Sequence, residues 1–313
     1  MSISPLVTIG VPNYNYAHFI IRTLESVARQ DYPNIELVIV DDCSTDNSIA
    51  VIEAWIENYK GNIRTRFIKN NFNNGLTANC NLILKNASGK YIQFLDADDL
   101  ILPGKIKTQV EQMEVLEVAA LIYSDVFVID EKDEIIANSY LNSIGYNKSI
   151  MPSGKIQEQL FDFNFIPLPS VLVRTAYIHE ASGFDETLSV QDYYLWLKIT
   201  EKHTVIYMPG PTAMYRVHAH SMSNSRSTNP RSVDSILTIN YRYYKNANEL
   251  IRKKIKRTIH NSAAHLYKLK YPTAKKWLQV DFFLNPGLKT ALYFLGRQLG
   301  IPYLFFEKLK SKF

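Results

Sequence analysis

Residues 91–99 read Tyr-Ile-Gln-Phe-Leu-Asp-Ala-Asp-Asp and contain the pattern that decides the fold. A run of strand-forming residues, 91–95, ends abruptly in three carboxylates within four positions. Carboxylates this close repel one another, and a divalent cation offsets the repulsion because hard cations prefer oxygen ligands. The carboxyl end of a strand is also where an open α/β sheet binds its ligands. The segment therefore predicts a metal site or, more simply, a polar turn that leads into a helix N-terminus.

Apolar runs alternate with helical patterns along the chain, which predicts an α/β fold. Strands are expected at residues 7–11, 35–40, 66–68, 91–95, 120–123, 170–173 and 205–208. Helices are expected at residues 17–30, 48–59, 76–87, 105–116 and 193–200. This alternation favours a mostly parallel, Rossmann-like sheet with helices on both faces. Between these elements, residues 126–169 indicate a hairpin and loops.

Composition places the chain among globular proteins with a sizeable core. It has 313 residues, of which 46% are hydrophobic. The two cysteines, Cys43 and Cys80, offer neither a disulfide framework nor metal-ligand spacing, so a reducing compartment fits. The first residues lack the pattern of a secretory signal, and no uninterrupted apolar run reaches the roughly 18 residues of a membrane span. We therefore expect a cytoplasmic protein.

Positive charge is concentrated toward the C-terminal end. The whole chain has a net charge of +5. Residues 241–313 carry 16 lysines and arginines against 3 acids, which gives this segment +13 and the rest of the chain −8. We expect a helical extension at 233–313 that packs on the core or binds an anionic membrane, peripheral on the inner face of the plasma membrane. The acidic body argues against nucleic acid as a partner.

Two other strand ends carry polar side chains. The first expected strand runs into Pro12-Asn13-Tyr14-Asn15, and the second into Asp41-Asp42-Cys43-Ser44-Thr45-Asp46. Because both lie at carboxyl ends of neighbouring strands, we expect them to converge on one crevice. A carboxylate there can accept hydrogen bonds from a base or ribose, although Asp46 is explained as well by helix capping. No glycine-rich phosphate loop is present, so a bound nucleotide needs another positive charge, such as a metal ion.

The chain resembles family 2 glycosyltransferases of the bacterial cell-surface polysaccharide type over about residues 5–220. Its signatures occur in the order of that family: residues 7–15, 36–46, 74–79, 91–99, 183–186 and 191–196. The resemblance implies a GT-A fold at 1–232, followed by the basic helical extension at 233–313. Within the GT-A domain, the nucleotide-binding half is expected at about 1–125 and the acceptor-binding half at about 126–232.

The resemblance implies roles for the residues that would hold the nucleotide. Asp41 and Asp42 match an acidic pair that contacts uracil or ribose; Asp42 is favoured, but the sequence does not separate the two. Pro12 and Tyr14 match positions that line the nucleoside. Arg216 could offset phosphate charge.

The DxD motif of the family is matched by Asp96-Ala97-Asp98. By resemblance, Asp98 would bind Mn²⁺ or Mg²⁺, and Asp96 would contact the ribose or the water shell of the metal. Asp99 is interpreted as a helix-start residue. His218, in the matching stretch Tyr-Arg-Val-His after the last expected strand, is the favoured further metal ligand or pyrophosphate contact, with His220 as the alternative because alternate residues of an extended segment share a face.

Asp192 matches the catalytic base of the family, and Gln191 replaces the acid that usually precedes it. The roles together imply an inverting, metal-dependent hexosyltransferase with a nucleotide-sugar donor, expected to be a UDP-sugar. A glycan or lipid-linked saccharide would be the acceptor, in surface polysaccharide, O-antigen or capsule synthesis. The alternatives are a non-catalytic module of the same fold that binds sugar nucleotides or glycans, and a nucleotidyltransferase, which would show a glycine-rich basic loop after the first strand.

Overall fold

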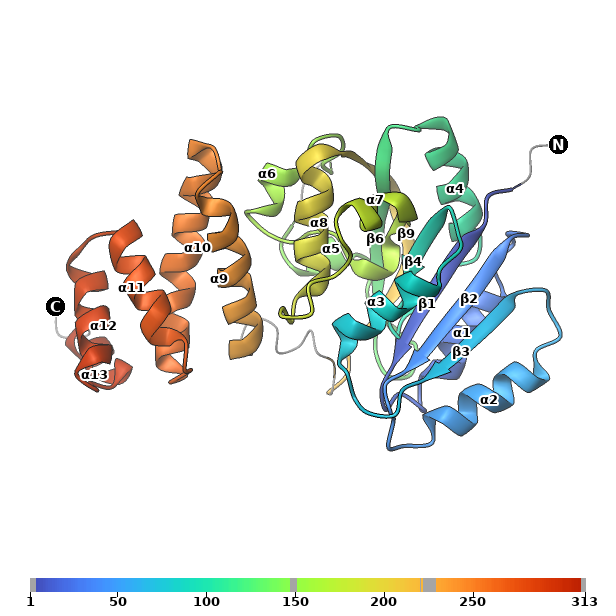
Figure 1. The fold of residues 1–313 in the computed structure, drawn as a ribbon, viewed down its shortest axis with the longest axis horizontal. Coiled ribbons are helices and arrows are strands. Elements are labelled where there is room, and N and C mark those ends of the chain that lie inside the picture. The colour runs from blue at the N-terminus through green and yellow to red at the C-terminus, as the bar shows by residue number, and fades with distance from the viewer. Residues whose placement is uncertain (1–3, 147–150, 220, 222–228, 311–313) are drawn as a thin grey trace. The chain divides into compact units, whose positions relative to one another are not determined.

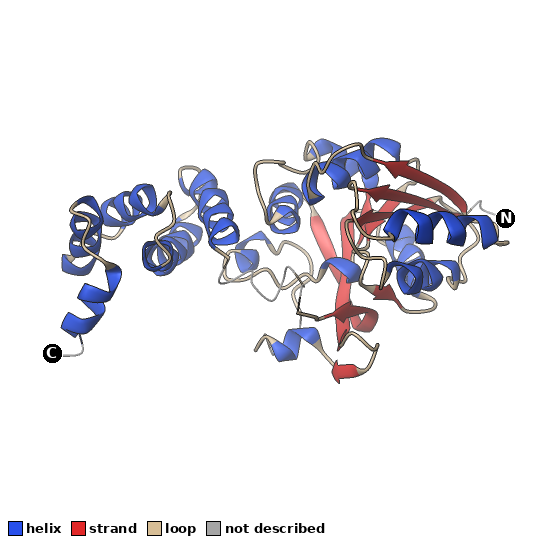
Figure 2. Ribbon diagram, turned by 90° about the horizontal axis from the view of Figure 1, so that it is seen from below, coloured by secondary structure: helices blue, strands red, loops and turns tan. Residues whose placement is uncertain are grey.

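The computed structural model describes residues 4–146, 151–219, 221 and 229–310, and the chain divides into two compact units (Figure 1). The sheet unit holds the chain up to Thr187 and from Gln191 to Ser221. The helical unit holds Leu188–Val190 and the described residues from 229 onward. Figure 2 shows that the strands lie in the sheet unit, whereas the described part of the helical unit is built from helices.

The strands of the sheet unit are β1 (Val7–Asn13), β2 (Ile35–Asp41), β3 (Arg64–Lys69), β4 (Tyr91–Phe94), β5 (Leu100–Ile101), β6 (Ala119–Ile129), β7 (Ile135–Ala137), β8 (Leu172–Arg174) and β9 (Thr204–Arg216). Its helices are α1 (Ile20–Ala28), α2 (Ser48–Asn58), α3 (Leu76–Asn86), α4 (Lys105–Val115), α5 (Tyr140–Ser143), α6 (Gln157–Leu160), η1 (Leu168–Ser170), α7 (Thr175–Glu180) and α8 (Gln191–Lys202).

The strand order among the described residues is β3-β2-β1-β4-β8-β6-β9-β5, with β7 paired to β6. Strands β1 to β4, β6 and β9 run in the same direction, and β5, β7 and β8 run against them. The predicted mostly parallel α/β sheet is therefore confirmed. Because the register pairs Asn13 with Asp41, the two polar strand ends lie side by side at the carboxyl edge.

Helices cover both faces of the parallel part of the sheet. On one face, Val7, Ile9 and Val11 of β1 pack in a core with apolar residues of α1, α2 and α4. On the other face, α3 approaches so closely that a Cβ on Gly10 would lie 2.2 Å from Ile83. Strands β1, β2 and β4 are buried along their whole lengths, as expected for central parallel strands covered on both faces.

Two strands extend further than the sequence indicates. The expected strands at 120–123 and 205–208 are the starts of β6 and β9, which pair in parallel along their lengths. Their polar and proline-containing interruptions shift the register between Ser124 and Val126 without ending the pairing. The sequence reasoning took these interruptions as strand ends, which was wrong; in consequence Tyr215 and Arg216 belong to β9 instead of following it.

The helical unit contains α9 (Pro230–Tyr244), α10 (Glu249–Lys268), α11 (Ala274–Leu284), α12 (Leu288–Gln298) and α13 (Tyr303–Lys310). Its core includes Ile251, Ile255 and Ile259, spaced by four along α10, with Trp277 of α11. In the part of the chain that the structure describes, no helix is both long and apolar enough to cross a membrane. The predicted boundary at residue 232 and the two halves of the first domain stay predictions.

A buried lysine, Lys105 at the start of α4, contacts strand β4 of the sheet. Nζ of Lys105 donates to Oε1 of Gln93 at 2.5 Å and to Oε1 of Gln109 at 2.8 Å. Burial lowers the pKa of Lys105 well below its usual value. A neutral amine has two N–H groups, and these match the two amide oxygens.

We expect the free energy of unfolding of the wild type to rise with pH relative to Lys105→Met. Between the lowered native pKa and the unfolded value, the unfolded chain binds one more proton at Lys105, so stability increases by up to about 1.4 kcal/mol per pH unit. Urea denaturation of both proteins between about pH 7 and pH 9 measures this difference. A difference that does not change with pH would contradict a neutral Lys105.

Candidate active site

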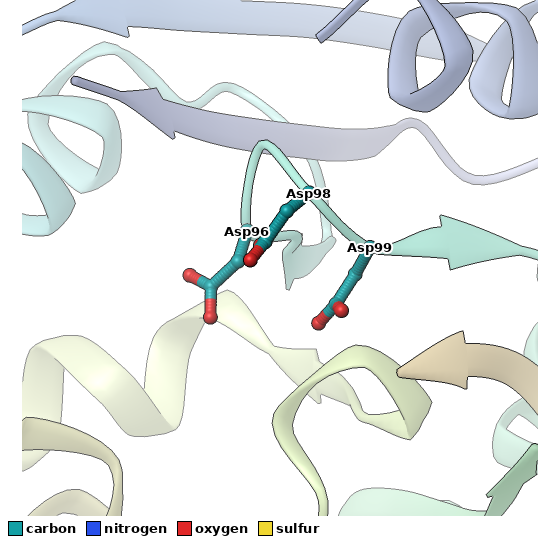
Figure 3. A group of neighbouring side chains, drawn as sticks. All are labelled: Asp96, Asp98 and Asp99. Atoms are coloured by element: carbon teal, nitrogen blue, oxygen red, sulfur yellow. The ribbon is translucent and has the colours of Figure 1, made fainter. Parts of the chain in front are cut away.

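The acidic segment follows β4 at the carboxyl edge of the sheet. The amide of Leu95 donates to the carbonyl of Gly10 at 2.9 Å, and the amide of Asp99 closes a tight turn onto the carbonyl of Asp96 at 3.0 Å. The side chains of Asp96, Asp98 and Asp99 leave this turn on the same side (Figure 3). One oxygen from each lies within 4.8 Å of the others, which is a spacing that one cation can bridge.

The electrostatics of this cluster fit a cation. Burial raises the pKa of Asp98, against the opposing effect of the hydrogen bond and charge of His218. Burial raises the pKa of Asp99 well above its usual value, and the charges of Asp98 and Asp96 add to the rise. Three carboxylates that disfavour one another's ionised form would be stabilised by a divalent ion.

His218 lies directly beside Asp98. Its Nε2 is 3.0 Å from Oδ2 of Asp98, and its side chain is buried. The imidazole packs against the ring of Phe19, with centroids 4.9 Å apart, and meets Tyr16 edge-on at 5.8 Å. The structure thus brings together Asp98 and His218 as the sequence reasoning expected for two metal ligands. The alternative ligand, His220, lies outside the described residues.

Asp99 does not begin a helix, so that interpretation was wrong. The chain continues from Asp99 into β5, and the next helix, α4, starts only at Lys105. Oδ1 of Asp99 instead accepts a hydrogen bond from the backbone N–H of Arg216, at 2.8 Å. This hydrogen bond fastens the acidic turn to the end of β9. The pairing of β5 with β9 holds the same two segments together.

Arg216 has protein partners for its guanidinium. Nε donates to the carbonyl of Asp98 at 2.7 Å, Nη1 donates to the carbonyl of Asp130 at 2.6 Å, and Nη2 pairs with the carboxylate of Asp133. The side chain is fully buried. Through these contacts Arg216 acts as a brace between the acidic turn and the β6–β7 hairpin, and its predicted contact with phosphate stays a prediction.

Asp41 and Asp42 shape two loops at the neighbouring strand ends. Asp41 accepts hydrogen bonds from Asn13 at 2.7 Å and from the backbone and hydroxyl of Ser44 at 2.9 and 2.7 Å. Asp42 accepts from the backbone amides of Asn74 and Gly75, both at 2.8 Å. Both carboxylates are buried. Each therefore has a structural role in addition to the predicted contact with the nucleoside.

The segment after β1 is held against the loop after β2. Oδ1 of Asn15, at a φ of 59°, accepts from the backbone N–H of Thr45 at 2.7 Å. Pro12 is buried within β1, whereas Tyr14 is 43% exposed. An exposed ring between two tethered residues is available to pack on a flat ligand.

Asp192 lies in the first turn of α8 and is buried. Its Oδ2 accepts from Nδ2 of Asn164 at 3.3 Å. Burial raises the pKa of the Cys80 thiol well above its usual value, and the charges of Asp96 and Asp192 add to this rise. The two carboxylates therefore lie in one neighbourhood around α3. No pattern in the sequence indicates a role for Asn164, because it lies in an irregular segment without periodicity.

The comparisons with known proteins decide the family. The model of glycosyl transferase family 2 matches residues 8–168, a range that includes both loops and the acidic turn. The chain belongs to this family. It is also 33% identical over 222 residues to UDP-Glc:alpha-D-GlcNAc-diphosphoundecaprenol beta-1,3-glucosyltransferase WfaP of Escherichia coli, a match that covers 71% of this chain and 81% of that protein.

Other relatives are longer than this chain. An uncharacterized glycosyltransferase of Rickettsia bellii is 32% identical over 204 residues, which cover 62% of this chain and 27% of that protein. The chain matches 31% of the length of a second Rickettsia relative, from Rickettsia felis. It therefore spans less than a third of these relatives.

Solved structures of the GT-A class share the fold. Mannosyltransferase PcManGT from Pyrobaculum calidifontis, in complex with GDP-Man and Mn²⁺, matches with a TM-score of 0.61 at 18% identity and covers 99% of this chain and 85% of its own. TarS 1-349 of S. aureus, in complex with UDP-GlcNAc, matches with a TM-score of 0.60 at 16% identity and covers 94% and 92%. The predicted GT-A fold is confirmed.

The brace formed by Arg216 can be tested at Asp133, its partner in the β6–β7 hairpin. Asp133 pairs with Arg216 and also with Arg22, at 3.0 Å. Burial alone would raise the pKa of Asp133, but the hydrogen bonds and charges of these two arginines outweigh it and hold the pKa below its usual value.

We expect Asp133→Asn to lower the free energy of unfolding by about 1–3 kcal/mol, because it removes the ion pair that the buried guanidinium of Arg216 makes with this carboxylate. Glu131→Gln is the matched control: it removes an acid from the same turn, and we expect a change of less than about 0.5 kcal/mol. Urea denaturation at neutral pH measures both. Equal free energies of unfolding for the two variants would mean that the ion pair of Asp133 with Arg216 does not stabilise the protein.

Proposed function

We propose that the chain transfers a sugar from a nucleoside diphosphate sugar to an acceptor hydroxyl, with inversion at the anomeric carbon. The observation that carries this proposal is the acidic cluster at the end of β4, with Asp192 in the same neighbourhood and the two loops after β1 and β2 at the same sheet edge. Binding elements for a diphosphate, a nucleoside and a reacting hydroxyl are then adjacent.

Asp192 is the proposed base. In a single displacement the acceptor oxygen attacks the anomeric carbon, the bond to the diphosphate breaks, and the acceptor proton passes to a carboxylate oxygen of Asp192. The hydrogen bond from Asn164 orients that carboxylate. Gln191, which is buried beside it, leaves Asp192 without a neighbouring acid in sequence.

Asp98, His218 and Asp96 are proposed to hold the donor diphosphate through Mn²⁺ or Mg²⁺. When bound, this ion would neutralise negative charge on the departing nucleoside diphosphate. Asp98 and His218 would provide the ligand atoms, and Asp96 would contact the ribose or the water shell of the metal. The fit rests on the oxygen spacing of the cluster and on its mutual repulsion.

The nucleoside is proposed to lie against the loops after β1 and β2. Tyr14 offers an exposed ring for the base, Pro12 shapes the end of β1, and Asp41 or Asp42 accepts hydrogen bonds from base or ribose. A UDP-sugar is the proposed donor. The names of WfaP, a UDP-Glc enzyme, and of the TarS complex with UDP-GlcNAc support uridine, whereas the complex of PcManGT with GDP-Man keeps guanosine open.

The proposed acceptor is a glycan or a lipid-linked saccharide of a bacterial surface polysaccharide. The name of WfaP includes a diphosphoundecaprenol acceptor, and a second relative, 29% identical over 198 residues, is chondroitin synthase of Escherichia coli. Such an acceptor would place the enzyme in the cytoplasm at the inner face of the plasma membrane. A non-catalytic module of the same fold is the alternative, and turnover separates the two.

A donor screen tests the proposed function. We expect the purified chain to release UDP or GDP from one nucleotide sugar in the presence of Mn²⁺, to lose that activity in EDTA and to regain it with added Mn²⁺. Release is measured by a coupled nucleotide assay. Binding of a donor without turnover would favour the module, reversal that depends on pyrophosphate would favour a nucleotidyltransferase, and full activity in EDTA would remove the metal role of Asp98.

Replacing the proposed base separates chemistry from binding. We expect Asp192→Asn to cut turnover at least about a hundredfold while the donor still binds, because the variant loses a proton acceptor and keeps the shape of the side chain. Asp31→Asn, at an exposed position of the sheet unit, is the control and should keep wild-type turnover. Calorimetry with the donor reports binding, and near-normal turnover in Asp192→Asn would rule out its role as base.

A further inference from the structure

The outer face of α12 is a stripe of leucines. Leu288, Leu292, Leu295 and Leu299, which directly follows the helix, recur at intervals of four, three and four residues, so they lie along one side of the helix. They are 79%, 42%, 54% and 75% exposed. A surface helix normally carries polar side chains on its outer face, so this leucine stripe is an exception that needs a partner.

The leucine stripe is not required for packing within the helical unit. The opposite side of α12 is buried through Thr290, Tyr293 and Gly296. Tyr293 packs against Tyr267 and Phe306, with ring centroids 6.2 and 5.6 Å apart. Because α12 already has a buried face, four leucines on the other side gain nothing within the unit.

The charge around the leucine stripe is one-sided. Ten of the twelve lysines and arginines between residues 242 and 289 are exposed, and Lys289 directly follows Leu288, the first residue of the stripe. Asp281, one of the few acids, is buried and faces His260 at 3.1 Å. The helical unit therefore presents a basic surface with an apolar stripe, the combination that binds the interface of an anionic bilayer.

We propose that the leucine stripe of α12 is a membrane-docking surface. The leucines insert into the interface of an anionic lipid leaflet while the lysines and arginines of the helical unit contact lipid headgroups. The helix has 11 residues, about 16 Å at 1.5 Å per residue, and is too short to span a bilayer, so it lies in the membrane plane. A nucleic acid would bind the lysines and arginines but would have no use for the exposed leucines. A second copy of the chain would bring two strongly basic surfaces together, which like-charge repulsion disfavours.

This inference goes beyond the proposed function and does not depend on it, because it is tested without donor or acceptor. The full chain is sedimented with vesicles of equal parts phosphatidylglycerol and phosphatidylcholine, and with vesicles of phosphatidylcholine alone. We expect binding to the mixed vesicles, and at least about tenfold weaker partition into the neutral ones.

The variants isolate the leucine stripe. Leu288→Gln with Leu299→Gln should weaken partition into the mixed vesicles at least about tenfold, whereas Leu288→Met with Leu299→Met should keep it. Val115→Gln with Val118→Gln removes two apolar side chains of similar exposure, 81% and 75%, from the sheet unit and should change nothing. Circular dichroism and thermal unfolding check that the variants fold; all four changes are at exposed positions.

Three results would overturn the proposal. The first is wild-type partition of the glutamine variant of the leucine stripe. The second is equal binding of the wild type to neutral and anionic vesicles. The third is a concentration-dependent dimer, seen by sedimentation velocity without vesicles, that the same glutamine pair dissociates; a second copy would then cover the leucine stripe. The proposal is supported if Leu288→Gln with Leu299→Gln loses vesicle binding, the other variants keep it, and all of the proteins remain monomeric.

Discussion

Repulsion among the carboxylates after β4 is the constraint on which the rest of the sheet unit depends. Asp96, Asp98 and Asp99 offer oxygens within 4.8 Å of one another in a place where Asp98 and Asp99 are buried. Such an arrangement is unstable alone, because burial and like charge both disfavour the ionised form. It persists because β9 supplies the backbone N–H and the guanidinium of Arg216, and the chain after β9 supplies His218.

The neighbouring strand ends are organised by carboxylates whose hydrogen-bond donors are neutral groups. Asp41 and Asp42 are each satisfied by hydrogen bonds from asparagine, serine or backbone donors of adjacent loops. These bonds fix the loops before any ligand arrives, so the proposed nucleoside-binding loops are preorganised while the acidic turn retains unbalanced charge. A site of this kind would use the cation and donor to complete its electrostatics, and would need little rearrangement of the backbone.

The sequence predicts features that depend on local patterns, and it misses features that depend on contacts between residues far apart in the chain. Strands such as β1 and β2, and the strand end before Asp96, have a local pattern of apolar runs followed by polar residues, so they could be placed. Asp133 and Asn164 could not, because their roles depend on contacts across the fold with Arg216 and Asp192. Likewise, the interruptions within β6 and β9 look like turns locally, and only the pairing of the two strands makes them bulges.

The brace at Arg216 also has a consequence for how the protein folds. Its contact with the carbonyl of Asp98 joins residues 118 positions apart, and His218 meets Asp98 across 120 positions. Closing such long loops costs chain entropy before any contact compensates for it, so we expect these contacts to form late in folding. During synthesis, the acidic turn emerges long before its basic partners and must stay hydrated until β9 arrives. We therefore expect the acidic turn to reach its final geometry late in the folding of the sheet unit.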